Sequence, residues 1–261
     1  MAEIITADHG KESGHWYKRD GSPAYTVIGK NGNERPTTLR DARKENLLPS
    51  VTTIIRCAAA PGLVNWMIDQ AIMAALTLPR IEGENDAEFM ARVKADSKEQ
   101  AKKAAEKGTL IHSWVQGGFE GKMLPVAGEP FYRSAVRTLD KECCPQLWIS
   151  EKSFATGRFG GKVDLHNDDY LIDIKSTDKY LGALKTWDEM HMQAAAYDEG
   201  MGGPARKCGI LYINVNTAES RLIWITGEEL LRGWECFEAL VDFWYAKSGL
   251  IISLDIQPEG A

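Results

Sequence analysis

The chain has 261 residues, of which 44% are hydrophobic and 26% are charged, and its formal net charge is −6. This composition is ordinary for a globular protein with a sizeable core, and it argues against a low-complexity chain. The acidic average argues against a protein coated with basic residues, although an enzyme needs only a local basic groove to bind a nucleic acid.

Cysteine usage and the first residues indicate the compartment. The five cysteines are irregularly spaced and form no Cys-x-x-Cys pair. This pattern is typical of a reducing compartment and argues against zinc and iron–sulfur sites. The chain begins without a basic segment followed by an apolar run, and no apolar stretch is as long as a membrane span. We expect a cytoplasmic protein with no membrane partner, located in the bacterial host if a phage encodes it.

The first 48 residues are polar and rich in glycine and basic residues. We expect residues 1–48 to form an N-terminal extension with short strands, in which residues 15–18 and 24–29 pair across a turn. One larger domain is expected over residues 49–261, with a helical N-terminal part.

Helices are predicted in the first part of this larger domain. A helix over residues 48–55 is favoured because Ser50 can cap it and Pro49 closes the preceding segment. Apolar spacing predicts further helices over residues 61–78, 85–115 and 130–139.

At residue 147 an alternation typical of strands replaces the helical spacing. Strands are predicted over residues 147–154, 161–166, 170–175, 208–214 and 220–225. Helices are predicted over residues 184–200 and 227–247. This order predicts the α/β (α+β) class, with a mixed central β-sheet flanked by helices.

The polar residues of one predicted strand carry the chemistry. Asp173 and Lys175 are two residues apart, so their side chains share one face of the strand. Ile172 and Ile174 point to the other face, which we expect to be the core. Asp164 lies on the preceding strand, where its carboxylate can meet that of Asp173.

Two neighbouring carboxylates repel each other unless a cation lies between them. Oxygen ligands suit Mg²⁺, for which Mn²⁺ can substitute. A lysine beside them can orient or deprotonate water, or balance the charge of a phosphate, as phosphodiester hydrolysis requires. A surface hairpin with ordinary alternating charge is the alternative. The flanking isoleucines argue against it, because an idle Asp–Lys pair is costly in a buried strand.

Four short segments together resemble a known family. They are Gly108 to His112, Gly161 to Asp164, Asp173 to Lys175, and Gln193 to Tyr197. In this order they resemble the motifs of the RecB-like branch of the PD-(D/E)XK nuclease superfamily. Residues 49–54, Pro-Ser-Val-Thr-Thr-Ile, are similar to a segment of phage exonucleases and of the mitochondrial genome maintenance exonuclease. The resemblance implies a restriction-endonuclease-like core.

The resemblance also implies a set of metal ligands. Asp164 and Asp173 would bind Mg²⁺ through their carboxylates, with the main-chain carbonyl of Ile174 as a third ligand. His112 would bind a metal or orient the leaving side of the substrate.

Further roles follow from the same resemblance. Lys175 would position the attacking water, and Gln193 and Tyr197 would hold the DNA backbone or the lysine. Glu151 begins the strand before Asp164 and is interpreted as a second acid behind the ligands or as a plain surface residue.

Candidate DNA contacts lie nearer the N-terminus. The residues with this expected role are Ser50, Thr52, Thr53, Arg40 and Arg43. For the two arginines, a solvated face is the alternative interpretation.

The expected function is that of a Mg²⁺-dependent exonuclease that acts on the ends of linear DNA, in phage recombination, replication or end processing. A single-strand annealing or single-strand binding protein is a candidate partner. A site-specific endonuclease, a nuclease directed at RNA, and a non-catalytic DNA-binding or assembly protein on a nuclease fold are the alternatives.

Overall fold

A five-stranded sheet forms the centre of the computed structural model, which describes residues 14–58, 61–203 and 206–252. The strands, in their order across the sheet, are β5 (Ile149–Ala155), β6 (Gly160–His166), β7 (Tyr170–Thr177), β8 (Lys207–Asn214) and β9 (Ser220–Trp224). Neighbouring strands are antiparallel except β7 and β8, which are parallel. The sheet is therefore mixed, as the sequence predicts.

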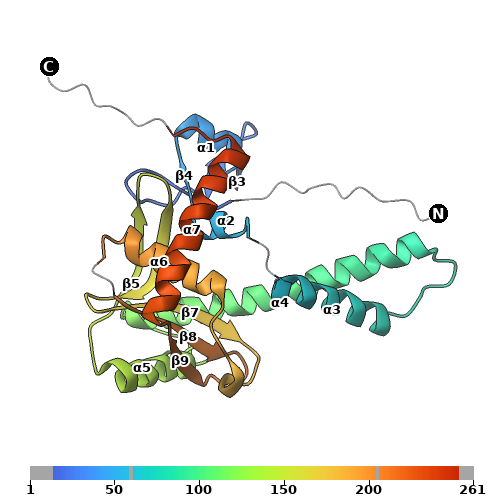
Figure 1. The fold of residues 1–261 in the computed structure, drawn as a ribbon. Coiled ribbons are helices and arrows are strands. Elements are labelled where there is room, and N and C mark those ends of the chain that lie inside the picture. Colours follow the sequence, from blue (N-terminus) through green and yellow to red (C-terminus); the bar gives the residue numbers. More distant parts are fainter. Residues whose placement is uncertain (1–13, 59–60, 204–205, 253–261) are drawn as a thin grey trace.

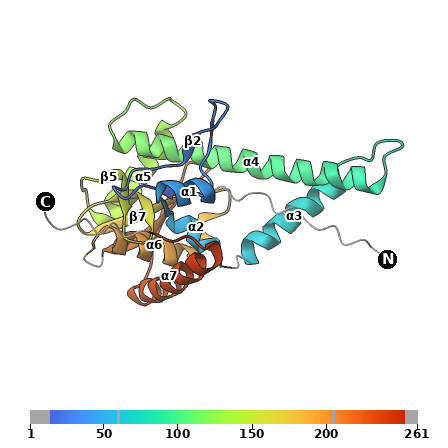
Figure 2. The same cartoon turned by 90° about the horizontal axis from the view of Figure 1, so that it is seen from above.

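Helices cover both faces of this sheet (Figures 1 and 2). The crossover between the parallel strands β7 and β8 runs through α6 (Asp188–Gly200), since parallel strands need a long connection. On the same face as α6 lie α7 (Gly227–Ser248) and α2 (Val51–Ile55), and on the other face lie α4 (Asp86–Phe119) and α5 (Glu129–Cys143). The predicted fold class is confirmed.

Strand β7 contributes to both cores through its alternating side chains. Leu171 is buried in the core beneath α6 and α7. Ile172 and Ile174 are buried in the core beneath α4 and α5. The face assignment predicted from the two-residue period of a strand is confirmed, and it places the polar residues of β7 opposite the isoleucines.

The predicted helices form with shifted ends. Ser50 caps α2, and its hydroxyl accepts a hydrogen bond of 3.0 Å from the backbone N–H of Thr53. A reciprocal pair of cap hydrogen bonds between Asn85 and Glu88 begins α4. Helix α6 begins later than the predicted residue 184, because Trp187 is extended and the acidic first turn starts only at the following residue.

The N-terminal strands pair differently from the prediction. Strand β1 (Trp16–Tyr17) pairs with β4 (Leu48–Pro49), and β2 (Thr26–Ile28) pairs with β3 (Glu34–Pro36). The predicted pairing of residues 15–18 with 24–29 forms only at its start, where Tyr17 bridges Pro23 and the backbone N–H of Ala24 donates to the carbonyl of Trp16 at 2.8 Å. Burial explains the difference, since Trp16 packs against Trp244 of α7 and brings β1 to the body of the protein.

Helix α1 (Leu39–Glu45) lies between β3 and β4 in the chain and is capped by Thr38. The predicted division of the chain at residue 48 stays a prediction. It falls inside β4, which β1 joins across that position.

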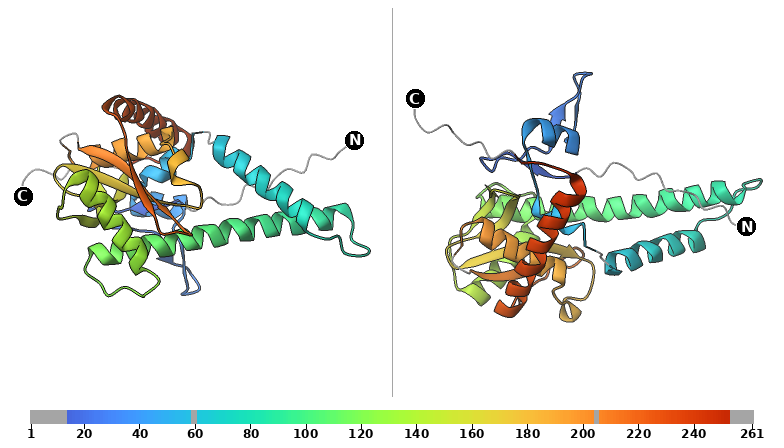
Figure 3. Two further views of the ribbon diagram at one scale, coloured as in Figure 1. Left: turned by 90° about the horizontal axis from the view of Figure 1, so that it is seen from below. Right: turned by 45° about the horizontal axis from the view of Figure 1, so that its top comes forward.

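A helical arm projects from the body. Helix α3 (Pro61–Thr77) packs along the N-terminal half of α4, and both extend away from the sheet (Figures 1 and 3). The C-terminal half of α4 lies on the sheet, against β5 and β7. Within the described ranges, every helix is too short or too polar to cross a lipid bilayer.

Candidate active site

The site forms where strands β6 and β7 separate. Their backbones pair only at Leu165 with Ile172 and at His166 with Leu171. One residue further along, the carboxylate of Asp164 replaces the backbone acceptor and takes a hydrogen bond of 2.7 Å from the N–H of Ile174. This contact fixes the orientation of the carboxylate at the opening between the strands.

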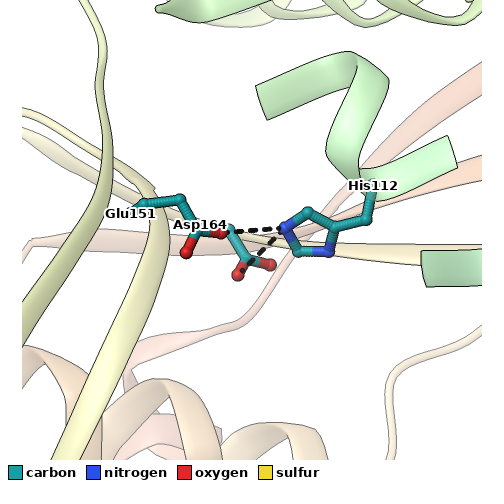
Figure 4. Close-up of side chains that lie close together, drawn as sticks. All are labelled: His112, Glu151 and Asp164. Carbon is teal, nitrogen blue, oxygen red and sulfur yellow. Dashed lines mark ion pairs between the residues drawn. The ribbon is translucent and has the colours of Figure 1, made fainter. Parts of the chain in front are cut away.

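Three side chains from different elements meet at this opening (Figure 4). His112 comes from α4, Glu151 from β5 and Asp164 from β6. The Nε2 atom of His112 lies 3.3 Å from Oε1 of Glu151 and 3.5 Å from Oδ1 of Asp164. One nitrogen and two oxygens of these residues all lie within 4.8 Å of one another.

Glu151 has an unusual backbone. It lies between the β5–β6 pairs formed by Ser150 with Leu165 and Lys152 with Val163, so it stands opposite Asp164. Its φ is +56°, in the left-handed region. That conformation costs a residue with a side chain about 1–2 kcal/mol. Such strain persists only where the surrounding structure enforces it, and it is concentrated at functional sites.

The charges of the cluster match a divalent cation. Burial and the nearby charge of Asp173 raise the pKa of Asp164 to about 6, because they outweigh the favourable contacts of its charged form. Burial opposes the charging of His112, but Glu151 and Asp164 outweigh it and raise the pKa of the imidazole. Within the described residues, the buried Nε2 of His112 makes no hydrogen bond of good geometry.

The spacing of the three atoms also fits an ion. Ligands about 2.1 Å from Mg²⁺ lie up to about 4.2 Å apart across the ion. Separations of at most 4.8 Å therefore need only a small adjustment. Carboxylate oxygens suit Mg²⁺ and Mn²⁺, and an imidazole nitrogen favours the transition metal of the two.

A second polar network lies beside the cluster. Lys175 Nζ lies 2.8 Å from Oδ2 of Asp173 and donates to Oε1 of Gln193 at 3.2 Å. Gln193 in turn donates to Oδ1 of Asp173 at 3.0 Å and to the Tyr197 hydroxyl at 2.9 Å. Gln193 and Tyr197 are one turn apart on α6, so a single helix face braces the lysine and the carboxylate.

Both ionisable ends of this network are strongly perturbed. Burial alone would lower the pKa of Lys175, but the charges of Asp173 and Asp164 outweigh it and raise that pKa. Burial, with Asp173 beside it, raises the pKa of Tyr197 well above its usual value. Lys175 is therefore an ammonium group at neutral pH, and Tyr197 is a neutral phenol.

Two glycines allow these elements to approach one another. A Cβ on Gly108 would lie 2.6 Å from Oγ of Ser176, so a side chain there would have to displace that hydroxyl where α4 crosses β7. A Cβ on Gly161 would lie 2.6 Å from the ring of Phe154 and 2.9 Å from that of Tyr197. The glycines of the predicted motifs thus have a steric reason.

The predicted ligand set is only partly the set that meets here. His112 and Asp164 belong to the three-residue cluster, which holds Glu151 in place of Asp173. Asp173 lies in the neighbouring network, where Lys175 balances its charge. The metal roles predicted for Asp173 and for the carbonyl of Ile174 stay predictions.

Lys162 is a residue near the cluster that the sequence interpretation missed. Its ammonium group forms an ion pair with Glu151, and it precedes Asp164 by two residues on β6. Alternation along β6 was the available signal, because residues two apart on a strand share a face. The place of Glu151 also depends on the β5–β6 register, which the strand pattern by itself did not provide.

The predicted DNA contacts lie on α1 and α2. Ser50 is 3% exposed, and its hydroxyl is engaged with Thr53 in the cap. Thr53 also accepts a hydrogen bond from the backbone of His15. Arg43 donates to the carbonyl of Ser248 at 2.6 Å, and Arg40 is exposed. These contacts give Ser50 and Thr53 a structural part, and the DNA role of the whole set, including Thr52, stays a prediction.

Comparison with known proteins finds only distant likeness. No protein-family model matches the chain. No curated protein matches it either. Among solved structures, a candidate exonuclease from Eubacterium rectale is 16% identical, with a TM-score of 0.39, over 56% of this chain and 69% of that one. LHK-Exo, an alkaline exonuclease from Laribacter hongkongensis, is 12% identical, with a TM-score of 0.30, over 71% of this chain and 97% of that one. At this distance the functional conclusion depends on the site itself.

Proposed function

We propose that this protein is a divalent-metal-dependent DNA exonuclease that hydrolyses phosphodiester bonds from DNA ends. The observation that supports it best is the juxtaposition of two groups of residues. A half-buried cluster of one imidazole and two carboxylates lies beside a lysine that a carboxylate and an amide hold in place. A cation site and a positioned cationic donor can both stabilise the negative charge that develops during phosphodiester hydrolysis.

His112, Glu151 and Asp164 would hold the cation, with Asp173 beside them. A bound Mg²⁺ or Mn²⁺ supplies Lewis-acid stabilisation of phosphoryl charge and lowers the pKa of water. The backbone N–H of Ile174 keeps one oxygen of Asp164 engaged and leaves Oδ1 directed at His112. Lys162 neutralises part of the charge of Glu151.

Lys175 would donate rather than accept a proton. Its raised pKa keeps it charged, so it can orient a water molecule and balance the charge of a phosphate oxygen. Gln193 restrains the ammonium group from one side and Asp173 from the other. The Tyr197 hydroxyl accepts a hydrogen bond from Gln193 and holds its side chain in place, so α6 restrains the position of the lysine.

The preference for DNA, the action on ends and the phage context are proposed from the resemblance of the four sequence motifs. The same resemblance motivates a single-strand annealing or binding protein as a partner. The exposed Arg40 on α1 remains available for a phosphate contact. Because phosphate contacts release counterions, we expect binding to weaken steeply as the salt concentration rises.

Digestion of end-labelled DNA tests the proposal. Linear single- and double-stranded DNA, labelled at the 5′ or the 3′ end, is incubated with Mg²⁺, with Mn²⁺ or with EDTA, beside closed circular DNA and labelled RNA. We expect release of nucleotides or short products from linear DNA with either metal. Cleavage of closed circles would instead indicate an endonuclease, and preferential cleavage of RNA would overturn the choice of substrate. No cleavage with either metal would favour the non-catalytic alternative.

A further inference from the structure

The helical arm exposes an unusual amount of apolar surface. Among the α3 side chains described, from Val64 onward, Ala74 is the single buried one. Between residues 64 and 90, the exposed large hydrophobic side chains are Val64, Trp66, Met67, Ile68, Ile72, Met73, Leu76, Ile81 and Met90. Scattered exposed apolar residues are normal, but a continuous patch of this kind marks an interaction site.

The apolar residues of α3 surround the helix. At about 100° per residue, Val64, Ile68 and Ile72 form one row, and Trp66 and Met73 lie on nearly the opposite side. Asp69 is the one charged residue of α3. A helix that is apolar on all sides is normally buried. Packing along α4 covers one side of α3 and leaves the remainder for a partner.

The charges of the arm are divided along its length. Residues 80–88, at the tip, contain four acidic residues and one arginine. Residues 92–107, on the next turns of α4, contain six basic and three acidic residues. Some of these charges pair within the arm, as Arg80 does with Asp86 and Lys103 with Glu99. An excess of negative charge remains at the tip and an excess of positive charge behind it.

We propose that the α3–α4 arm pairs with the same arm of a second copy of this chain, antiparallel about a two-fold axis. In that arrangement the acidic tip of each copy lies beside the basic segment of the other. The contact therefore occurs twice, as a two-fold interface requires. The apolar sides of the two α3 helices face each other, which removes them from contact with water. The two sheet bodies lie at opposite ends of the paired arms.

A nucleic acid strand fits this surface less well. Most of the exposed α3 side chains are aliphatic, whereas single strands bind through aromatic stacking and basic grooves. The acidic tip would also repel phosphates. A second copy satisfies both the apolar and the charged parts of the arm at once.

Sedimentation velocity of the full chain at several micromolar concentrations tests the pairing. We expect a particle of twice the 29.0 kDa chain mass. The variant Ile68→Glu with Ile72→Glu should raise the dimer Kd at least tenfold and yield monomers. Both side chains are about half exposed, at 50% and 51%, so circular dichroism should show an unchanged fold. Leu231→Glu on α7, at 62% exposure, is the matched control and should leave the dimer intact.

Charge reversal provides a second, independent test. Lys94→Glu with Lys98→Glu in one chain, and Glu82→Lys with Asp86→Lys in another, should each weaken self-association. An equimolar mixture of the two should recover dimers, because the reversed charges again complement each other. A monomeric wild-type protein at 100 μM, or an unaffected Ile68→Glu/Ile72→Glu variant, would overturn the pairing. The pairing would also be overturned if the wild-type protein were a monomer and the Lys94→Glu/Lys98→Glu variant, unlike the Glu82→Lys/Asp86→Lys variant, lost affinity for single-stranded DNA. The sedimentation experiments measure mass, so their outcome is independent of the proposed nuclease activity.

Discussion

The site and the arm reverse the usual distribution of polarity in opposite ways. At the site, Asp173 is only 2% exposed and the carboxylates of Glu151 and Asp164 are partly buried, while on the arm Leu76 is 76% exposed. Each reversal is costly for an isolated chain, since buried charges lack water and exposed apolar groups contact it. We interpret both regions as binding surfaces, as proposed above: for a cation at the site and for a second copy of the chain at the arm.

The largest expected effect comes from removing a carboxylate of the site. Asp164→Asn and Asp173→Ala should each reduce cleavage of linear DNA by about 10³-fold or more, since each removes charge that acts in the transition state. Asp164→Asn should keep its melting temperature without metal, because burial disfavours the charged form it replaces. Turnover near that of the wild type with Mg²⁺ would remove these residues from the chemistry.

Lys175→Ala should lower turnover about 10²-fold, as expected for a lost positioning or proton-transfer group. Gln193→Ala should have a smaller effect in the same direction, because Lys175 keeps its contact with Asp173. Rates from single-turnover digestion separate the two variants. If Gln193→Ala were the more damaging, the amide would act on the substrate rather than on the lysine.

Metal binding should stabilise the fold. At a Mg²⁺ or Mn²⁺ concentration of 100 times Kd, stability should rise by about 2.7 kcal/mol. For a protein of this size that is an increase of roughly 5–10 °C in melting temperature. Asp164→Asn and His112→Ala should lose most of the shift in a thermal melt, while the arm variant Ile68→Glu/Ile72→Glu should keep it. A shift that survives in Asp164→Asn would place the cation elsewhere.

The smallest effect is expected from Gly108→Ala, which should cost about 1–3 kcal/mol through overpacking. The added methyl group would meet Ser176 at 2.6 Å. Ser176→Gly in the same chain should restore part of the stability, as measured by urea unfolding. Gly157→Ala is the control, because nothing lies within 4 Å of the added group. An unchanged midpoint in Gly108→Ala would show that α4 adjusts freely over β7.

Local patterns predicted much of the fold and two of the three residues of the cluster. Helix α2 follows from the capping residue Ser50, and the strand β7 follows from the alternation of Ile172, Asp173 and Ile174. His112 and Asp164 were found through motif order. The pairing of β1 with β4 was missed, because it depends on the burial of Trp16 against a helix more than two hundred residues later.

By itself, the sequence determined which residues are polar on which face, because the periods of strands and helices are local properties. It also determined where the capped helices α2 and α4 begin, through the side chains of Ser50 and Asn85 that accept from the first free N–H groups. Only the tertiary structure decided that Glu151 joins His112 and Asp164, since this requires the β5–β6 register, a left-handed residue and a helix from another part of the chain. The tertiary structure also decided that α3 stays exposed. An apolar helix can be buried in the core of its own chain or against a partner, and the local spacing of apolar residues does not distinguish these two cases.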